Sequence, residues 1–167
     1  DPETGRYHGV GDLTERAALE AFIRSVQHEP LQGIGLNFAV VRQDTGRAVG
    51  ATALWDIAPE HRRGEIGRTW LAPETRRTGV NTEAKYLLLA HAFETLHLLR
   101  VQIKTDSRNT ASRRAIERLG AVYEGTLRAH MILHTGERRD TAYYSILADE
   151  WSATVKQSLE TRLIGGR

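Results

Sequence analysis

The chain has 167 residues, of which 40% are hydrophobic, and a formal net charge of +2 with neutral histidines. This length is typical of one domain, here 1–167, and it allows a buried core. The chain has no cysteine, which excludes a thiol nucleophile, a cysteine zinc site and any disulfide. The small positive charge suits an anionic ligand and gives no reason to expect nucleic acid.

Targeting and metal signals are lacking in the sequence. No apolar run approaches the length of a membrane span, and the N-terminal residues lack a signal-peptide pattern. The histidines show no spacing with carboxylates that is typical of a metal site. We therefore expect a cytoplasmic protein with no membrane segment and no metal, and the sequence leaves a monomer and a homodimer open.

The first half of the chain predicts one helix and three strands. Thr14–His28 has an amphipathic helical period, and Asp12 can cap it. The following segments alternate apolar and polar residues, with a turn at Asp44–Gly46 that makes the first two a hairpin. The predicted strands are Leu36–Arg42, Ala48–Ile57 and Glu65–Leu71.

The second half predicts three helices and three strands after a polar loop, Pro73–Gly79. A long helix is predicted over Thr82–His97, and a shorter helix ends at Gly120 in a left-handed cap. The long helix has a broad apolar face made by Leu88, Leu89, Ala92, Phe93 and Leu96. In chain order the remaining elements are strand Leu99–Thr105, helix Thr110–Leu119, strands Val122–Leu133 and Thr141–Leu147 joined at Thr135–Gly136, and helix Glu150–Ile164. The fold class is therefore α+β: a mixed, mostly antiparallel sheet in a layered arrangement with helices on its faces.

The segment Arg76–Thr82 lies between a predicted strand and the long helix. A helix start leaves backbone N–H groups unpaired, and the helix dipole favours an anion there. Gly79 allows a close approach of a phosphate and a positive φ, while two arginines and two threonines add charge and donors. A diphosphate fits this loop, which is neither a Walker A nor a Rossmann motif. A plain surface loop with Asn81 or Thr82 as helix cap is the alternative.

Several motifs together resemble the GNAT superfamily of N-acetyltransferases. Arg-x-x-Gly-x-x at Arg76–Asn81 resembles its acetyl-CoA loop, and further segments resemble the branch that contains the ribosomal-protein N-terminal acetyltransferases RimJ and RimL. These segments are Glu65–Glu74, Gly79–Ala84, Asn109–Ser112, Ile116–Ala121 and Glu124–Gly125, in the same order and spacing. The resemblance extends from about Phe38 to Trp151.

The resemblance implies an acetyl-CoA-dependent N-acetyltransferase in which a primary amine attacks the thioester directly, in a ternary complex. Coenzyme A is then held by the loop, and the backbone N–H groups of Trp70 and Leu71 are candidates to meet the thioester carbonyl. The implied loop contacts are Arg76, Arg77, Thr78, Gly79, Val80, Asn81 and Thr82. Two features depart from the family: Asn81 replaces a small residue, and Asp1–Gly11 does not supply the usual first strand and helix, so we expect the natural protein to be longer.

Ser112 is the candidate acid for the departing thiolate. It shares a helical stripe with Ala115, Ile116 and Leu119, whereas Arg113, Arg114, Glu117 and Arg118 are expected on the solvated face. A polar group on an inward face needs a partner, which a bound thiolate supplies. The resemblance gives the same role to this serine and a coenzyme A contact to Asn109. The alternative is a local capping pair of Asn109 and Ser112.

The base is less well defined. By resemblance a glutamate is expected near Met131, which cannot accept a proton. Neighbouring His130 has a suitable intrinsic pKa, and Glu65 and Asp56 on other predicted strands are further candidates. With pKa values of about 7.8 and 10.4, about one α-amine in seven is unprotonated at pH 7, against about one lysine in 2,500. This favours an α-amine acceptor, such as a protein N-terminus, although small-molecule amines also fit.

Two other functions remain as hypotheses. Ser112–Arg128 superficially resembles a helix-turn-helix DNA-binding motif, but its second half alternates with the period of a strand. An acyl-CoA-binding sensor that keeps the fold without catalysis is the other.

Overall fold

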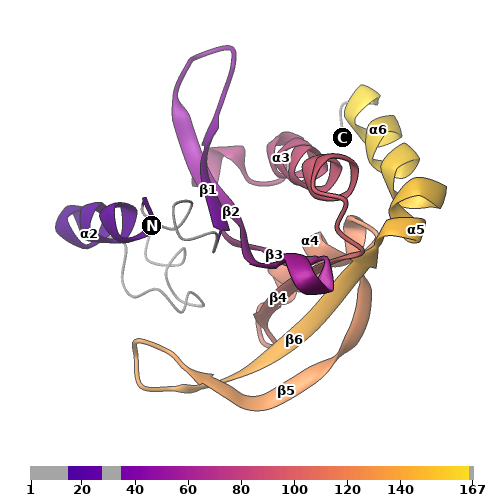
Figure 1. Cartoon of the computed structure of the whole chain (residues 1–167). Helices are drawn as coiled ribbons and strands as arrows, with labels where there is room; N and C mark the ends of the chain where they lie inside the picture. Colours follow the sequence, from indigo (N-terminus) through magenta and orange to yellow (C-terminus); the bar gives the residue numbers. More distant parts are fainter. Residues whose placement is uncertain (1–14, 28–34, 166–167) are drawn as a thin grey trace.

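The computed structural model describes residues 15–27 and 35–165, and its centre is one twisted sheet (Figure 1). Its strands are β1 (Gly35–Val41), β2 (Ala48–Ala58), β3 (Arg63–Leu71), β4 (Arg100–Asp106), β5 (Val122–Ile132) and β6 (Arg138–Leu147). They lie in the order β1-β2-β3-β4-β6-β5. Only β3 and β4 are parallel. The predicted α+β class with a mixed, mostly antiparallel sheet is confirmed.

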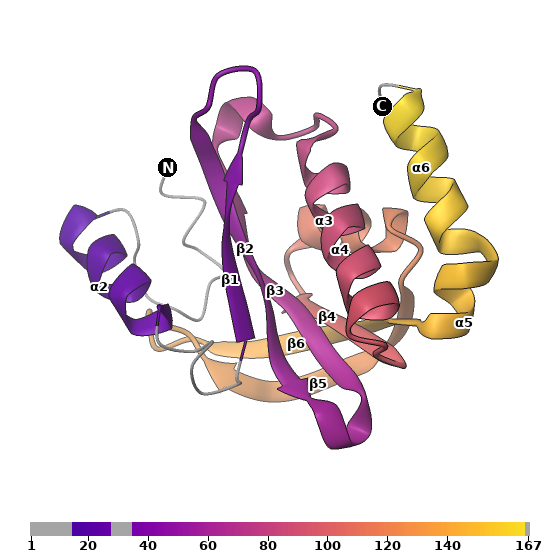
Figure 2. The same cartoon turned by 45° about the horizontal axis from the view of Figure 1, so that its top comes forward.

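Helices lie on both faces of this sheet. The described helices are α2 (Arg16–Val26), α3 (Val80–Ala90), α4 (Thr110–Arg118), α5 (Ala148–Glu150) and α6 (Lys156–Ile164). Figure 2 shows α3, α4 and α6 together on one side, and α2 beside β1 on the other. The Asn37 amide of β1 donates to the Val26 carbonyl at the end of α2, at 3.4 Å. Among the described residues no helix is both long and apolar enough to cross a membrane.

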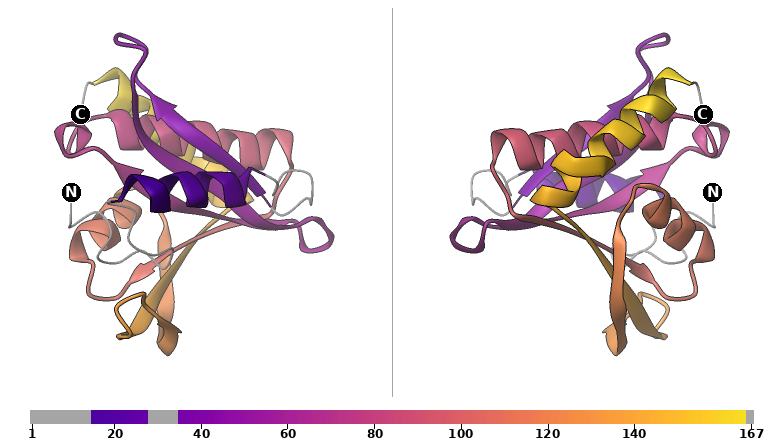
Figure 3. Two further views of the ribbon diagram at one scale, coloured as in Figure 1. Left: turned by 90° about the vertical axis from the view of Figure 1, so that its left-hand side faces the viewer. Right: turned by 90° about the vertical axis from the view of Figure 1, so that its right-hand side faces the viewer.

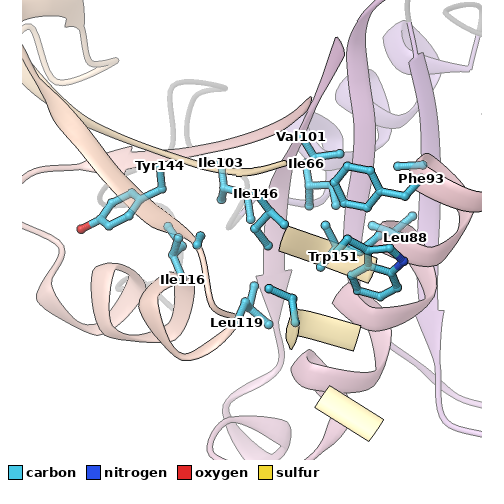
Figure 4. Close-up of a cluster of buried hydrophobic side chains, with 14 of the residues drawn as sticks. Ile66, Leu88, Phe93, Val101, Ile103, Ile116, Leu119, Tyr144, Ile146 and Trp151 are labelled. Carbon is cyan, nitrogen blue, oxygen red and sulfur yellow. The ribbon is translucent and has the colours of Figure 1, made fainter. Parts of the chain in front are cut away.

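The hydrophobic core fills the space between the sheet and the helices on the α3 side (Figure 4). Ile66, Val101 and Ile146 supply it from the strands, and Leu88 supplies it from α3. Trp151 of the C-terminal helical segment packs against Phe93, which follows α3, with the ring centroids 5.7 Å apart. Burial of each such side chain contributes about 1.5–3 kcal/mol, so this layer holds α3 and the C-terminal helices on the sheet.

Two helices differ from the sequence prediction in their bounds and their regularity. The long helix begins at Val80 instead of Thr82, and its last turn, His91–Thr95, is π-helical. Leu96, expected on the apolar face, is therefore outside the helix and 37% exposed. The C-terminal helix begins at Ala148 and also contains a π-helical turn, Trp151–Val155. The strand predicted at Thr141–Leu147 begins earlier, at Arg138.

The shorter turns agree with the prediction. Gly120 ends α4 with φ +93°, and Gly136 turns between β5 and β6 with φ +82°. The first predicted helix is confirmed for Arg16–Val26. Asp12, Thr14 and His28 lie outside the described residues.

The contact between β3 and β4 is short, and this opens the sheet. Their pairing covers only Arg63–Glu65 against Arg100–Gln102, although both strands continue beyond it. Figure 3 shows the sheet twisting strongly from β1 and β2 to β5 and β6. Beyond Glu65 and Gln102 the two strands no longer pair with each other. This separation leaves room for a ligand at the middle of the sheet.

Candidate functional site

A cavity of about 620 Å³ occupies the gap between β3 and β4, a volume common for small-molecule sites. Ile66, Ile103 and Ile116 line it on the core side. Side chains alternate between the faces of a strand, so Glu65 and Lys104, next to Ile66 and Ile103, line it from the other side of the sheet. The cavity therefore has walls on both faces of the sheet.

The cavity lining is strongly basic. One acidic side chain, Glu65, lines it, together with six basic ones: Arg68, Arg76, Lys85, Lys104, Arg108 and Arg139. Arg108 is held by the buried Asp106 carboxylate, with Nη2 to Oδ2 at 2.9 Å. Burial opposes ionisation of Asp106, but the Arg108 guanidinium and backbone N–H outweigh it and lower the pKa of this carboxyl. A ligand with several negative charges matches this lining.

The start of α3 faces open space. Gly79 is the N-cap and forms no side-chain cap bond, so neither Asn81 nor Thr82 caps the helix. A Cβ placed on Gly79 would meet nothing within 4 Å among the described atoms. The first N–H groups of a helix have no carbonyl of their own helix to bond. That of Val80 bonds the Thr78 hydroxyl, so those of Asn81 and Thr82 are the ones available to an anion beside the cavity, which Asn81 lines.

The expected positive φ at Gly79 is wrong. Gly79 has φ −66°, whereas Arg77 has φ +61°. The loop turns two residues earlier, where the Thr78 hydroxyl donates to the Thr75 carbonyl at 2.6 Å and accepts from Val80 N at 3.3 Å. The glycine therefore keeps the space before the helix empty and does not supply an unusual backbone conformation.

The predicted loop residues divide into two groups. Arg76 and Asn81 line the cavity, as do Trp70 and Leu71 of β3. The others are absent from its lining and remain predictions: Arg77, Thr78, Gly79, Val80 and Thr82.

β3 contains a bulge beside the cavity. Ala51 pairs with Trp70 and Ala53 with Gly67, so Thr52 alone stands opposite two residues, Arg68 and Thr69. Arg68 has φ +50°. A bulge of this kind takes its extra residue out of the ladder, which leaves backbone groups of this stretch available to a ligand. The indole N–H of Trp70 is buried and has no hydrogen-bond partner among the described residues.

Asn109 and Ser112 lie at the start of α4. The Asn109 side chain accepts from Ser112 N at 3.0 Å, so the capping alternative is confirmed for Asn109. Capping uses the backbone of Ser112 and leaves its hydroxyl without a hydrogen bond in the described part of the chain. Both residues line the cavity, together with Ala115, Ile116 and Leu119 of the predicted stripe.

On the expected solvated face Glu117 is exposed and Arg113 is half-buried, and both also contact a distant strand. Arg113 Nε donates to the Tyr144 hydroxyl at 2.9 Å, and that hydroxyl donates to Glu117 Oε1 at 3.0 Å. Tyr144 is fully buried in β6, and burial is the largest cause that raises the pKa of its hydroxyl. In Figure 4 the Tyr144 hydroxyl points away from the aliphatic core. Only the pairing of α4 with a distant strand reveals this contact, so the helical period alone could not predict it.

The three candidate bases occupy different surroundings. Glu65 is 2% exposed and lines the cavity, where Lys104 Nζ lies 2.8 Å and Gln102 Nε2 2.9 Å from Oε2. Asp56 pairs instead with Arg63 at 2.7 Å and does not line the cavity.

His130 also lies outside the cavity lining. Its Nδ1 is 3.1 Å from the Thr141 hydroxyl, and its Nε2 is 3.4 Å from the Tyr143 hydroxyl. Burial, followed by the charges of Lys104 and Arg139, lowers the pKa of His130 below 6.5. The imidazole is therefore mainly neutral at pH 7.

Lys85 is a site residue that the sequence reasoning missed. It lies on α3, is 5% exposed and lines the cavity. Its Nζ donates to the hydroxyls of Thr52 and Thr69 at 2.8 and 2.5 Å, and burial lowers its pKa to about 7. The signal was present in the helical period, because Lys85 stands three and four residues before the apolar Leu88 and Leu89.

Known proteins share this sequence pattern and this fold. The family model described as "Acetyltransferase (GNAT) domain" matches residues 1–122. YdaF of Bacillus subtilis (strain 168), described provisionally as a ribosomal N-acetyltransferase, is 37% identical over 106 residues, which are 64% of this chain and 57% of YdaF.

Two solved structures extend the comparison to the whole fold. A GCN5-related N-acetyltransferase from Brucella melitensis is 30% identical, with a TM-score of 0.87 over 99% of this chain and 76% of that chain. Mycobacterium smegmatis RimJ, solved in complex with CoA-disulfide, has a TM-score of 0.82 over 98% of this chain and 78% of that chain. At 21% identity this second likeness concerns the fold alone.

Proposed function

Because the chain belongs to the GNAT acetyltransferase family, we propose that its cavity binds acetyl-CoA and that the acetyl group passes to the α-amine of a protein N-terminus. The observation that carries this proposal is a single cavity whose walls include the start of α3, Ser112 of α4 and Glu65 of β3. This arrangement supports an anion site, an acid and a base around one space.

The residues present fit coenzyme A in charge and in hydrogen bonding. The N–H groups of Asn81 and Thr82 at the start of α3 and the guanidinium of Arg76 suit a diphosphate. The buried Trp70 indole N–H, unpaired within the described chain, suits an acceptor on the uncharged arm of the cofactor. When bound, acetyl-CoA supplies an activated acetyl group as a thioester.

The chain's own residues then have three tasks. Backbone N–H groups between Arg68 and Leu71, where β3 bulges, stabilise negative charge on the thioester oxygen. The Ser112 hydroxyl, which caps nothing, donates its proton to the departing sulfur. Asn109 holds Ser112 in place through its cap at 3.0 Å.

Glu65 is the proposed base. It lines the cavity on the side of the sheet opposite Ile66 and the core, whereas His130 and Asp56 do not line it. Lys104 pairs with one carboxylate oxygen, Oε2, and the other can accept a proton from the incoming amine or from a water between them. His130 lies on the same side and is proposed to border the acceptor.

An α-amine acceptor needs little help from a base. About one α-amine in seven is already neutral at pH 7, compared with about one lysine in 2,500. Carboxylates are weak bases in general, so a site with a carboxylate as its base suits the less basic amine. The likeness to YdaF, described provisionally as a ribosomal N-acetyltransferase, agrees with a protein acceptor.

Two measurements test this function. Calorimetry with acetyl-CoA should detect binding of one molecule per chain, and mass spectrometry should show acetylation of peptides with free N-termini in preference to N-terminally blocked lysine peptides at pH 7. Binding without transfer to any amine of a broad panel would support the sensor hypothesis. A preference for lysine would refute the α-amine assignment, and absence of binding would refute the function as a whole.

A further inference from the structure

Lys85 forms a polar network in an otherwise apolar layer. Neighbouring positions on the same face of α3 carry Leu88 and Leu89, which are buried in the core. Lys85 Nζ donates to the Thr52 and Thr69 hydroxyls, and those two hydroxyls lie 2.9 Å apart. None of the carboxylates that the structure describes pairs with this amine, whose pKa is lowered by burial alone. Such a buried amine is costly to the fold.

The network ends on the bulge of β3. The Thr69 hydroxyl donates to the Gly67 carbonyl at 3.1 Å, and the Thr52 hydroxyl lies 3.5 Å from the same oxygen. Thr52 is the one β2 residue opposite the two bulged residues Arg68 and Thr69. Lys85 therefore ties α3 to both strands at the point where the ladder is interrupted.

We propose that Lys85 is a positioning residue, which through the Thr52 and Thr69 hydroxyls holds the β3 bulge in the shape that presents its backbone N–H groups to the thioester oxygen. This inference rests on the proposed function and adds to it a group that does not have to touch the substrate. An apolar residue at this position would pack well against the core. The destabilising amine of Lys85 is therefore explained by a role other than stability.

The test compares Lys85→Met, which keeps length and removes the amine, with wild type. We expect kcat to fall about ten- to a hundredfold, somewhat less than the direct loss of an oxyanion donor, about a hundred- to a thousandfold. The Kd for coenzyme A, which has no acetyl group, should change less than about twofold, and Tm at pH 7 should rise because a buried amine is removed. A general structural defect would lower kcat and Tm together.

Variants of Thr69 extend the test. Thr69→Val should lower kcat as Lys85→Met does, whereas Thr69→Ser should keep most of the wild-type kcat because it retains the hydroxyl. The double variant Lys85→Met/Thr69→Val should lose no more kcat than either single variant. Lys156→Met, half-buried on α6 and outside the cavity lining, is the control for a lost lysine amine and should keep the wild-type kcat. An unchanged kcat in Lys85→Met, or an equal loss in Thr69→Ser and Thr69→Val, would overturn the proposal.

A readout without turnover separates this inference from the proposed function. Amide hydrogen exchange at Arg68 and Thr69 should become about tenfold faster in Lys85→Met while exchange in β6 stays constant. If wild type acetylates no amine, the proposed function fails, and the exchange data still decide whether Lys85 holds the bulge. Unchanged exchange at both residues would contradict the inference in either case.

Discussion

The Ser112 hydroxyl is available for chemistry because Asn109, and not Ser112, caps α4. Its backbone N–H is satisfied by the Asn109 side chain, whereas its hydroxyl has no partner within the described chain and lines the cavity. A serine that capped the helix itself would have its hydroxyl engaged. The division of roles between the two residues is therefore what leaves a proton donor free.

Ser112→Ala should lower kcat about a hundredfold, since positioned proton transfer contributes about a hundred- to ten-thousandfold, with little change in the Kd for coenzyme A. Steady-state acetylation of a peptide N-terminus and calorimetry measure the two quantities. Ser158→Ala, on the exposed side of α6, is the control. Full turnover in Ser112→Ala would remove this residue from the chemistry.

The two candidate bases, Glu65 and His130, predict different pH profiles of activity. A base must be unprotonated, so activity that depends on His130 falls as the pH drops through its lowered pKa, below 6.5. We expect Glu65→Gln to lower kcat about a hundredfold and His130→Asn to keep the wild-type profile of kcat/KM between pH 5 and 8. Loss of an acidic limb in His130→Asn alone would identify the imidazole as the base.

Lys85 makes stability depend on pH. Burial lowers its pKa from 10.5 to about 7, so between these values the unfolded chain holds a proton that the folded chain does not. The free energy of unfolding of wild type relative to Lys85→Met should therefore rise with pH in this range, with a slope that approaches about 1.4 kcal/mol per unit. Below about pH 7 the difference should be constant.

Denaturant titrations of both proteins from pH 6 to pH 10 measure this difference. The subtraction matters because tyrosines and other groups titrate in the same range in both proteins. A flat difference across the range would mean that Lys85 remains protonated in the fold.

At the scale of elements, the loop before α3 combines a helix start with one well-placed cation. Arg76 lines the cavity, whereas its neighbour Arg77, with φ +61°, is not among the lining residues. Charged hydrogen bonds contribute about 1.5–3 kcal/mol. Arg76→Ala should therefore weaken coenzyme A binding about ten- to a hundredfold, and high salt should reduce the difference from wild type.

Calorimetry at two salt concentrations checks this, with Arg47→Ala in the β1–β2 turn as the control for a lost surface charge. Equal affinities for Arg76→Ala and wild type would place the diphosphate elsewhere.

Local sequence predicted the elements where one period dominated. Leu88, Leu89, Ala92 and Phe93 repeat at helical spacing and are buried as expected. The π-helical turn at His91–Thr95 has no local signature, and it displaces Leu96 from the buried face. Arg113 on α4 also has the helical spacing of a surface residue, yet it bonds a tyrosine from a distant strand.

At the scale of the whole molecule, the sequence predicted the α+β class but could not predict the gap in the sheet. The gap depends on where the pairing of β3 with β4 stops, and these strands are joined through α3 rather than by a hairpin. The same reason explains why Lys85 was missed: its partners Thr52 and Thr69 are 33 and 16 residues away in the chain. Residue patterns together with the resemblance gave Ser112 and Arg76 as candidates, whereas only tertiary contact gave the network behind the bulge.

Because the cavity has walls on both faces of the sheet, both substrates of a catalytic cycle can be bound at the same time. Two ligands that approach from different faces need not exchange places, so each can stay while the other arrives. Double-reciprocal plots of velocity at several fixed levels of the second substrate should then give lines that meet at a point. Parallel lines would instead indicate an acyl group stored on the protein between two half-reactions.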